Sequence, residues 1–511
     1  MRATFFGLIM HDPGVVILTL TAGGVLLLVA ERCVAARNIV WWALAAVVLF
    51  VAGGLSFSTL ASPLETLHGR GVGRAAVLVW SSGLLLCLLS ASREFARDDV
   101  ERRGSSAGLL LLTIAGTLSV VAGVTARDLW MGLELIAFCE IARRQLEPNE
   151  PQRSAGEQGL SGETAAGLMA ALLFAIGIAL TNPSMDAGVR PAVASKVSEE
   201  SSRGNAPGIA GSSGTPRAAV STAFLIASLG MRLMAAPFHL PLWQLPALRS
   251  FSDLTAWMVL GRGAVVVAWA RLIVLPSSSE NAGALLTGVT AAASLGIGSL
   301  LLAREVAVRS GLHAAAMIQT GIVLAGLATT GWIATQPDLP PPGGLLELAS
   351  NAWLAALIAE GAVLLGLGAV SDGIRAPDRR LETLEDFRGL ARNSSMASAL
   401  IAIFLAGLAG LPLTAPFWGR LLVLACAWSV RRDFPGAASA ALHPAAVALT
   451  VLVVMGWISL IGYALRIVTL TFWRRPVCRH TLAGRWPLLL GALVATAIVV
   501  AGVWPSLLLR N

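Results

Sequence analysis

Long apolar stretches separated by short polar connections are the dominant pattern of this 511-residue chain. Each stretch approaches or exceeds the roughly 20 apolar residues that a helix needs to cross the hydrocarbon core of a membrane. The pattern therefore predicts an all-α polytopic membrane protein with about 14 transmembrane helices. The predicted helices cover residues 14–30, 39–60, 73–91, 106–124, 128–143, 163–181, 219–237, 254–275, 282–302, 309–330, 346–370, 396–430, 442–470 and 487–509.

Three segments depart from a regular span. The fifth helix includes two acids, Glu134 and Glu140, and the second of these lies near an arginine pair that indicates a membrane interface. The twelfth contains Pro412 and Pro416, which predict a bend or an unwound turn within the membrane. Residues 182–218 are rich in Ser, Gly, Pro and Ala, so we expect a flexible non-cytoplasmic insertion there.

Basic residues are concentrated in alternate connections between the predicted helices, as a count of 14 helices requires. Connections after odd-numbered helices carry 21 arginines, against 11 basic residues at the termini and even-numbered connections. Because cytoplasmic loops are enriched in Lys and Arg, this asymmetry predicts that both termini are non-cytoplasmic. The same bias accounts for the net charge of +8, so a nucleic-acid partner is not expected.

The five cysteines are scattered, and no two of them form a C-x-x-C pair. This spacing disfavours a disulfide framework, an iron–sulfur cluster or a zinc site. The first apolar stretch, residues 14–30, has no small-residue cleavage site and is followed by a second stretch, so we expect it to be a retained helix.

Three arginines, Arg232, Arg262 and Arg420, interrupt the apolar stretches, whereas Lys196, the only lysine, lies in a polar loop. An ionisable side chain inside a membrane is costly and is a candidate functional site. Lysine can lose its proton when it is desolvated, but arginine effectively cannot. The chain therefore places permanent positive charge in the membrane.

Two of these arginines lie close to helix breaks. Arg232 precedes Pro237 and His239 on the seventh helix, and Arg420 follows Pro412 on the twelfth. Paired proline-interrupted spans, about five helices apart, are typical of inverted repeats, here helices 4–8 and 9–13. The alternative is that each arginine only pairs with an acid and holds helices together.

Polar side chains on other helices supply candidate partners. Glu134 is expected to point inward, with Arg232 as its preferred partner. Glu360 lies deep in the eleventh helix and is either a second proton carrier or the partner of Arg420. His313 and Gln319 on the tenth helix either hold water or, as we favour, are satisfied by a neighbouring helix.

Several motifs together resemble one family, the antiporter-like membrane subunits of respiratory complex I, and within it the subunit N type. The resemblance spans the fifth to thirteenth helices, with the motifs in order and at matching spacing. The segments that carry it are Gly132-Leu133-Glu134-Leu135, Met231 to His239, Leu384-Glu385-Asp386-Phe387-Arg388-Gly389-Leu390, Leu408 to Arg420 and Ala464-Leu465-Arg466-Ile467-Val468.

The resemblance implies 14 helices with two inverted five-helix repeats, broken helices 7 and 12, and proton translocation coupled to quinone reduction elsewhere in the complex. NADH, FMN, iron–sulfur clusters and quinone are then expected in partner subunits and none in this chain. The implied partners are other complex I membrane subunits and the lipid bilayer, in a bacterial inner (plasma) membrane. The implied units are residues 1–105 (helices 1–3), 106–275 (first repeat), 276–470 (second repeat) and 471–511 (helix 14).

The departures from the family pattern concern its titratable groups. Arg232, Arg262 and Arg420 stand where the resemblance implies lysines, and Gln319 stands at a histidine position. A proton relay needs a group whose pKa can approach neutrality, whereas arginine starts at about 12.5 or higher.

Three interpretations follow. The arginines could be fixed charges that gate protons passing through Glu134, Glu360 and His239, which we favour slightly. This copy could instead be a structural subunit with an idle channel. A third interpretation is a subunit of a cation/proton antiporter or a membrane-bound hydrogenase.

Overall fold

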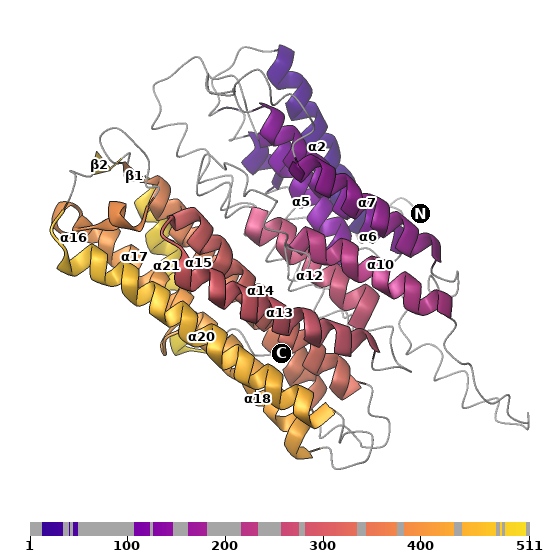
Figure 1. Ribbon diagram of the computed structural model, residues 1–511. Helices are drawn as coiled ribbons and strands as arrows, with labels where there is room; N and C mark the ends of the chain where they lie inside the picture. The colour runs from indigo at the N-terminus through magenta and orange to yellow at the C-terminus, as the bar shows by residue number, and fades with distance from the viewer. Residues whose placement is uncertain are drawn as a thin grey trace, which may run out of the picture.

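Helices make up nearly all of the chain that the structure, a computed structural model, describes (Figure 1). The N-terminal helices gather on one side of the assembly and the C-terminal helices on the other, with α13 and α14 between them. The fold is therefore all-α, as the apolar pattern predicts. The described residues are 13–33, 40, 44–49, 107–122, 126–146, 162–180, 216–233, 257–274, 282–334, 344–375, 383–433, 442–476, 481–482 and 486–506.

The first group of helices packs through small residues. It comprises α2 (Pro13–Cys33), α5 (Ala107–Ala122), α6 (Ala126–Leu146), α7 (Gly162–Leu180) and α10 (Pro216–Leu233). A methyl group built on Gly116 of α5 would lie 2.8 Å from the carbonyl oxygen of Gly132 on α6. Such close backbone approach is how helices associate where apolar burial gives little driving force.

The span predicted at 254–275 is not a uniform α-helix. It consists of a π-helical turn η1 (Trp257–Gly261), a short α12 (Arg262–Trp269) and a second π-helical turn η2 (Ala270–Val274). Single π-helical turns are rare and are frequent at functional sites. Because the 254–275 segment is almost uniformly apolar, its sequence pattern could not predict where the backbone hydrogen bonds change to the π-helical register.

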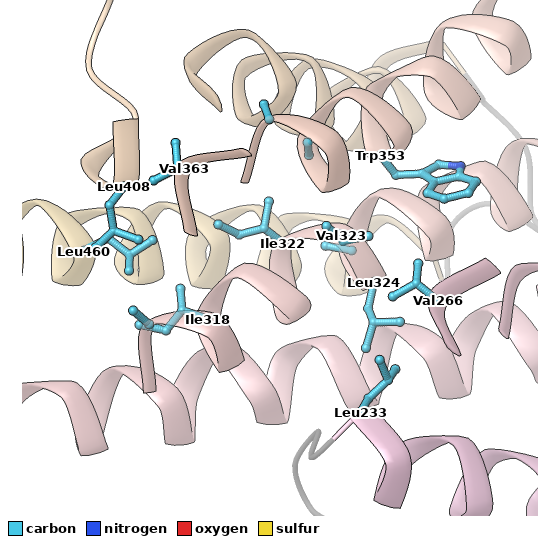
Figure 2. Close-up of a cluster of buried hydrophobic side chains, with 14 of the residues drawn as sticks. Leu233, Val266, Ile318, Ile322, Val323, Leu324, Trp353, Val363, Leu408 and Leu460 are labelled. Atoms are coloured by element: carbon cyan, nitrogen blue, oxygen red, sulfur yellow. The ribbon is translucent and has the colours of Figure 1, made fainter. Parts of the chain in front are cut away.

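The second group packs around α14 (Val308–Ala334), whose apolar span is buried along its whole length. Its members are α13 (Ala282–Arg304), α15 (Leu345–Asp372), α17 (Ser395–Ala409), α18 (Ala415–Asp433), α20 (Leu442–Trp473) and α21 (Trp486–Val503). Figure 2 shows Leu324 of α14 beside Leu233 and Val266, so one apolar core joins the two groups.

One end of the second group is organised by the Leu384–Leu390 motif. It forms η3 (Leu384–Phe387), in which Asp386 accepts hydrogen bonds from the backbone and hydroxyl of Thr383, and leads into α16 (Leu390–Asn393). Gly389 has φ +67° and lies against Pro476, so a side chain has no room there. Nearby, β1 (Ile374–Arg375) pairs antiparallel with β2 (Thr481–Leu482).

Four described helices, α13, α14, α15 and α20, are long and apolar enough to cross a membrane, and seven further apolar helices are shorter. Most described helices begin or end within a few residues of their predicted bounds. The 73–91 span, most of the 39–60 span, Pro237, His239 and most of the 182–218 insertion lie outside the described residues.

Candidate functional site

The first charged pair joins α6 and α10. Arg232, in the last turn of α10, donates through Nη2 to Oε1 of Glu134, and its Nη1 donates to the Leu133 carbonyl at 3.2 Å. The Arg232 side chain is 9% exposed and that of Glu134 is 30% exposed. The pairing of Glu134 with Arg232 that the sequence favours is therefore present, in a half-buried setting.

The second charged pair joins α15 and α18 and is fully buried. Nε of Arg420 lies 3.4 Å from Oε1 of Glu360, and the two side chains are 0% and 3% exposed. Of the two roles left open for Glu360, the pairing with Arg420 is thus realised. A buried ion pair is costly to desolvate, so it stands only where further contacts support it.

Those further contacts come from a helix break. The predicted interruption of the 396–430 span is present, because α17 ends at Ala409 and α18 begins at Ala415. Gly410 ends α17 in the left-handed conformation, with φ +63°, and the Leu411 N–H donates to the Ala406 carbonyl. Pro412 lies inside the break. Pro416 lies in the first turn of α18, where its missing N–H costs nothing.

The break frees carbonyl groups at the end of α17, and two side chains bond to them. Arg420 donates through Nη2 to the Leu408 carbonyl at 2.9 Å, and Trp457 of α20 donates to the Ala409 carbonyl at 2.6 Å. The Arg420 guanidinium also lies 6.0 Å from the centroid of the Trp457 ring. A cation at a helix C-terminus meets the negative end of the helix dipole, so the break itself stabilises the charge of Arg420.

Arg262, the third intramembrane arginine, begins α12 and is 4% exposed. It interacts electrostatically with Glu360 without forming a direct ion pair, and its buried Nε has no hydrogen-bond partner among the described residues. Glu360 is therefore the carboxylate shared, at different ranges, by Arg262 and Arg420.

The polar residues of α14 differ from the expectation in one respect. His313 and Gln319 are both buried, at 6% and 0% exposure. The side-chain amide of Gln319 forms no hydrogen bond with any described residue, so the expected bond to a neighbouring helix is not found among them. A buried amide without a partner costs about 1–3 kcal/mol, which makes this position favourable for water.

Several residues form hydrogen bonds that the sequence analysis did not predict. Trp457 carried no motif, so its role beside the break could not be foreseen. Arg466 lay within a resembling segment and Arg271 within the predicted 254–275 helix, and they donate to the carbonyls of Glu305 and Val120 at 3.1 Å each. Within the described residues, no group of three or more His, Cys, Asp or Glu is placed to hold a metal ion.

The chain is similar to known antiporter-like membrane proteins. Residues 209–442 match the family described as NADH:quinone oxidoreductase/Mrp antiporter, TM. A protein of Cereibacter sphaeroides named NADH-quinone oxidoreductase subunit N is 29% identical over 84% of this chain and 83% of its own. The protein of the same name from Cupriavidus taiwanensis is 28% identical over 84% of this chain and 81% of its own.

Solved structures share the fold. A chain of respiratory complex I from Thermus thermophilus superposes with a TM-score of 0.63 at 18% identity, covering 97% of this chain and 99% of that one. A chain of the Mrp complex from Dietzia sp. gives 0.66 at 18% identity, covering 98% and 96%. The resemblance predicted from the motifs is confirmed: the chain is related to the antiporter-like membrane subunits of complex I, among which its relatives are named subunit N.

Proposed function

We propose that the chain is a subunit N-like membrane component of NADH-quinone oxidoreductase and translocates protons, coupled to quinone reduction carried out elsewhere in the complex. The observation that carries the proposal is the set of charges within the apolar helices: the half-buried Glu134–Arg232 pair, and the buried Glu360 that Arg420 and Arg262 share. Charges inside a membrane are retained where they line a path for ions or protons. The relatives named subunit N support the assignment to this complex.

In this proposal the arginines act as fixed charges, and the carboxylates and water carry the protons. Gln319, which is buried and has no hydrogen-bond partner among the described residues, holds water on the path. Pro237 and His239 lie outside the described residues; in this proposal they keep the roles that the sequence predicts, a helix break and a proton-path residue. NADH, FMN, the iron–sulfur clusters and quinone bind in partner subunits, so this chain contributes translocation and no redox chemistry.

The proposed architecture is 14 helices in a bacterial inner membrane, with both termini non-cytoplasmic and inverted repeats at 106–275 and 276–470. Residues 1–105 precede the repeats and 471–511 follow them. Matched contacts support the repeats: Arg271 bonds to Val120 near the end of α5, and Arg466 bonds to Glu305 just beyond α13. Each arginine thus joins the last helix of a repeat to the first. Reporter fusions at the two termini test their sides of the membrane.

Two alternatives are kept because specific observations favour them. Arginine at all three lysine positions favours a non-pumping structural copy in the same complex. The comparable likeness to a Mrp complex chain favours a subunit of a cation/proton antiporter or a membrane-bound hydrogenase.

Purification of the tagged chain in mild detergent, followed by mass spectrometry of its partners, separates these assignments. Co-purification with NADH-oxidising and quinone-site subunits is the expected result. Recovery with small antiporter subunits, or with none of these partners, would contradict membership of the oxidoreductase.

A further inference from the structure

Among the described residues, only one of the two carboxylate oxygens of Glu360 has a hydrogen-bond partner. Its Oε1 accepts from Nε of Arg420 at 3.4 Å, which is long for a charge-assisted hydrogen bond. Its Oε2 is buried and has no hydrogen-bond partner among the described residues. Half of this carboxylate is therefore available to bind something other than Arg420.

Arg420, by contrast, is held from several directions. It donates to the Leu408 carbonyl at 2.9 Å and lies beside the Trp457 ring. Its Nη1 also packs against Gly410, where a methyl group would lie 2.5 Å away. Because none of these contacts involves Glu360, Arg420 keeps its position if the carboxylate moves. Of the two charged groups, the Glu360 carboxylate has the fewer contacts that fix its position.

A second cation lies within electrostatic range of the same carboxylate. The helix α15 packs against η1, where a methyl group on Gly361 would lie 3.4 Å from the Val259 side chain. Arg262 follows Val259 by three residues, at the point where the π-helical turn η1 ends and α12 begins. It is buried and interacts with Glu360 through charge.

Among the described residues, Arg420 and Arg262 are the charged groups that act on Glu360. Of the other elements packed against α15, α17 and α21 carry no titratable side chain. The remaining charged or titratable residues on its neighbours are Arg309 and His313 on α14, Cys426, Arg431, Arg432 and Asp433 on α18, and Arg375 on β1.

We infer that Glu360 is the group in the second half of the chain that binds and releases the transported proton, by exchanging its carboxylate between Arg420 and Arg262. The inference rests on the proposed translocation and names the residue that replaces the titrating lysines. A hydronium ion on the water path gives up a proton to Oε2: one of its O–H bonds breaks, a water molecule remains, and the new O–H bond neutralises the carboxylate and weakens its attraction to Arg420. Release to water on the Arg262 side breaks that bond and restores the carboxylate. No electron is transferred.

Infrared difference spectroscopy of the purified complex tests this inference directly, because a protonated carboxyl group has a C=O stretch that a carboxylate lacks. We expect a C=O band that appears and disappears reversibly with pH, shifts on ¹³C-glutamate labelling and is lost in Glu360→Gln. The band should change in both Arg262→Gln and Arg420→Gln. Glu347→Gln, near the start of the same helix, is the matched control and should leave it intact.

Two results would overturn the inference. One is the absence of any such band in the wild-type complex, since Glu360 would then be a permanently ionised partner of Arg420. The other is a band that Arg262→Gln leaves unchanged, which would show that the Glu360 carboxylate does not exchange between Arg420 and Arg262. Isotope labelling keeps the first result independent of whether a variant assembles. The proposed function is decided separately, by the proton-to-electron ratio.

Discussion

Arg420 donates a hydrogen bond to the carbonyl of Leu408, a residue 12 positions earlier on the opposite side of a helix break. The contact closes α17 with a side chain from α18, so the break and the buried charge stabilise each other. The free α17 carbonyls attract a cation, and the cation satisfies one of them. This arrangement explains how an arginine with 0% exposure is tolerated in the core.

Gly410→Ala should destabilise the protein. The left-handed conformation costs about 1–2 kcal/mol for a residue with a Cβ, and the added methyl group would press on the Arg420 guanidinium. Thermal unfolding of the purified complex measures the effect as a lower melting temperature. Gly462→Ala in α20 is the control, because a methyl group there meets nothing within 4 Å. Equal stability of the two variants would contradict this role of Gly410.

Trp457→Phe should cost about 1 kcal/mol, because it removes the donor to the Ala409 carbonyl and keeps an aromatic ring beside Arg420. Trp473→Phe is the matched control on the same helix, where the tryptophan is 73% exposed. Unfolding midpoints of the two variants give the comparison. A loss no greater than that of the control would show that the break does not depend on this indole N–H.

Removing one member of the buried pair should be more harmful than removing both. Arg420→Gln leaves Glu360 without its ion-pair partner, and breaking a buried pair from one side costs about 3–5 kcal/mol. The double variant Arg420→Gln/Glu360→Gln removes both charges and should recover part of that loss. A double-mutant cycle of unfolding free energies measures the coupling between the two residues. Strict additivity would mean that they do not interact.

Arg232→Lys should preserve or raise proton translocation. A lysine can still pair with Glu134 and, unlike arginine, can also exchange its proton at the half-buried site. Proton release per electron, measured in membrane vesicles, is the readout, and Arg271→Lys, outside the two ion pairs, is the comparison. A clear loss of translocation in Arg232→Lys would mean that the guanidinium itself is required.

Much of the fold could be predicted from the apolar stretches, because a membrane-spanning helix is recognised by its length and hydropathy. The Glu134–Arg232 pair and the break near Pro412 could also be anticipated, since buried charges seek partners and proline removes a backbone donor. The π-helical turns beside Arg262 could not, because they change hydrogen-bond register without changing the apolar pattern. Trp457 was equally hidden, because its partner is a carbonyl group freed only by the tertiary structure.

The unpartnered amide of Gln319 marks a further limit of sequence reasoning. A glutamine in an apolar helix is compatible with a bond to a neighbour and with a bond to water. Only the packing of α14 against its surroundings distinguishes the two, and it leaves both amide atoms without a hydrogen-bond partner in the part of the chain that the structure describes.

The central claim is that protons cross the membrane through this chain. The most direct test is the ratio of protons translocated to electrons transferred, in inverted vesicles carrying Glu134→Ala, Arg232→Ala or Arg420→Ala in the assembled complex. The account predicts a lower ratio in each variant, with quinone reduction continuing. An unchanged ratio in all three assembled variants would contradict it and leave a structural subunit with an idle channel.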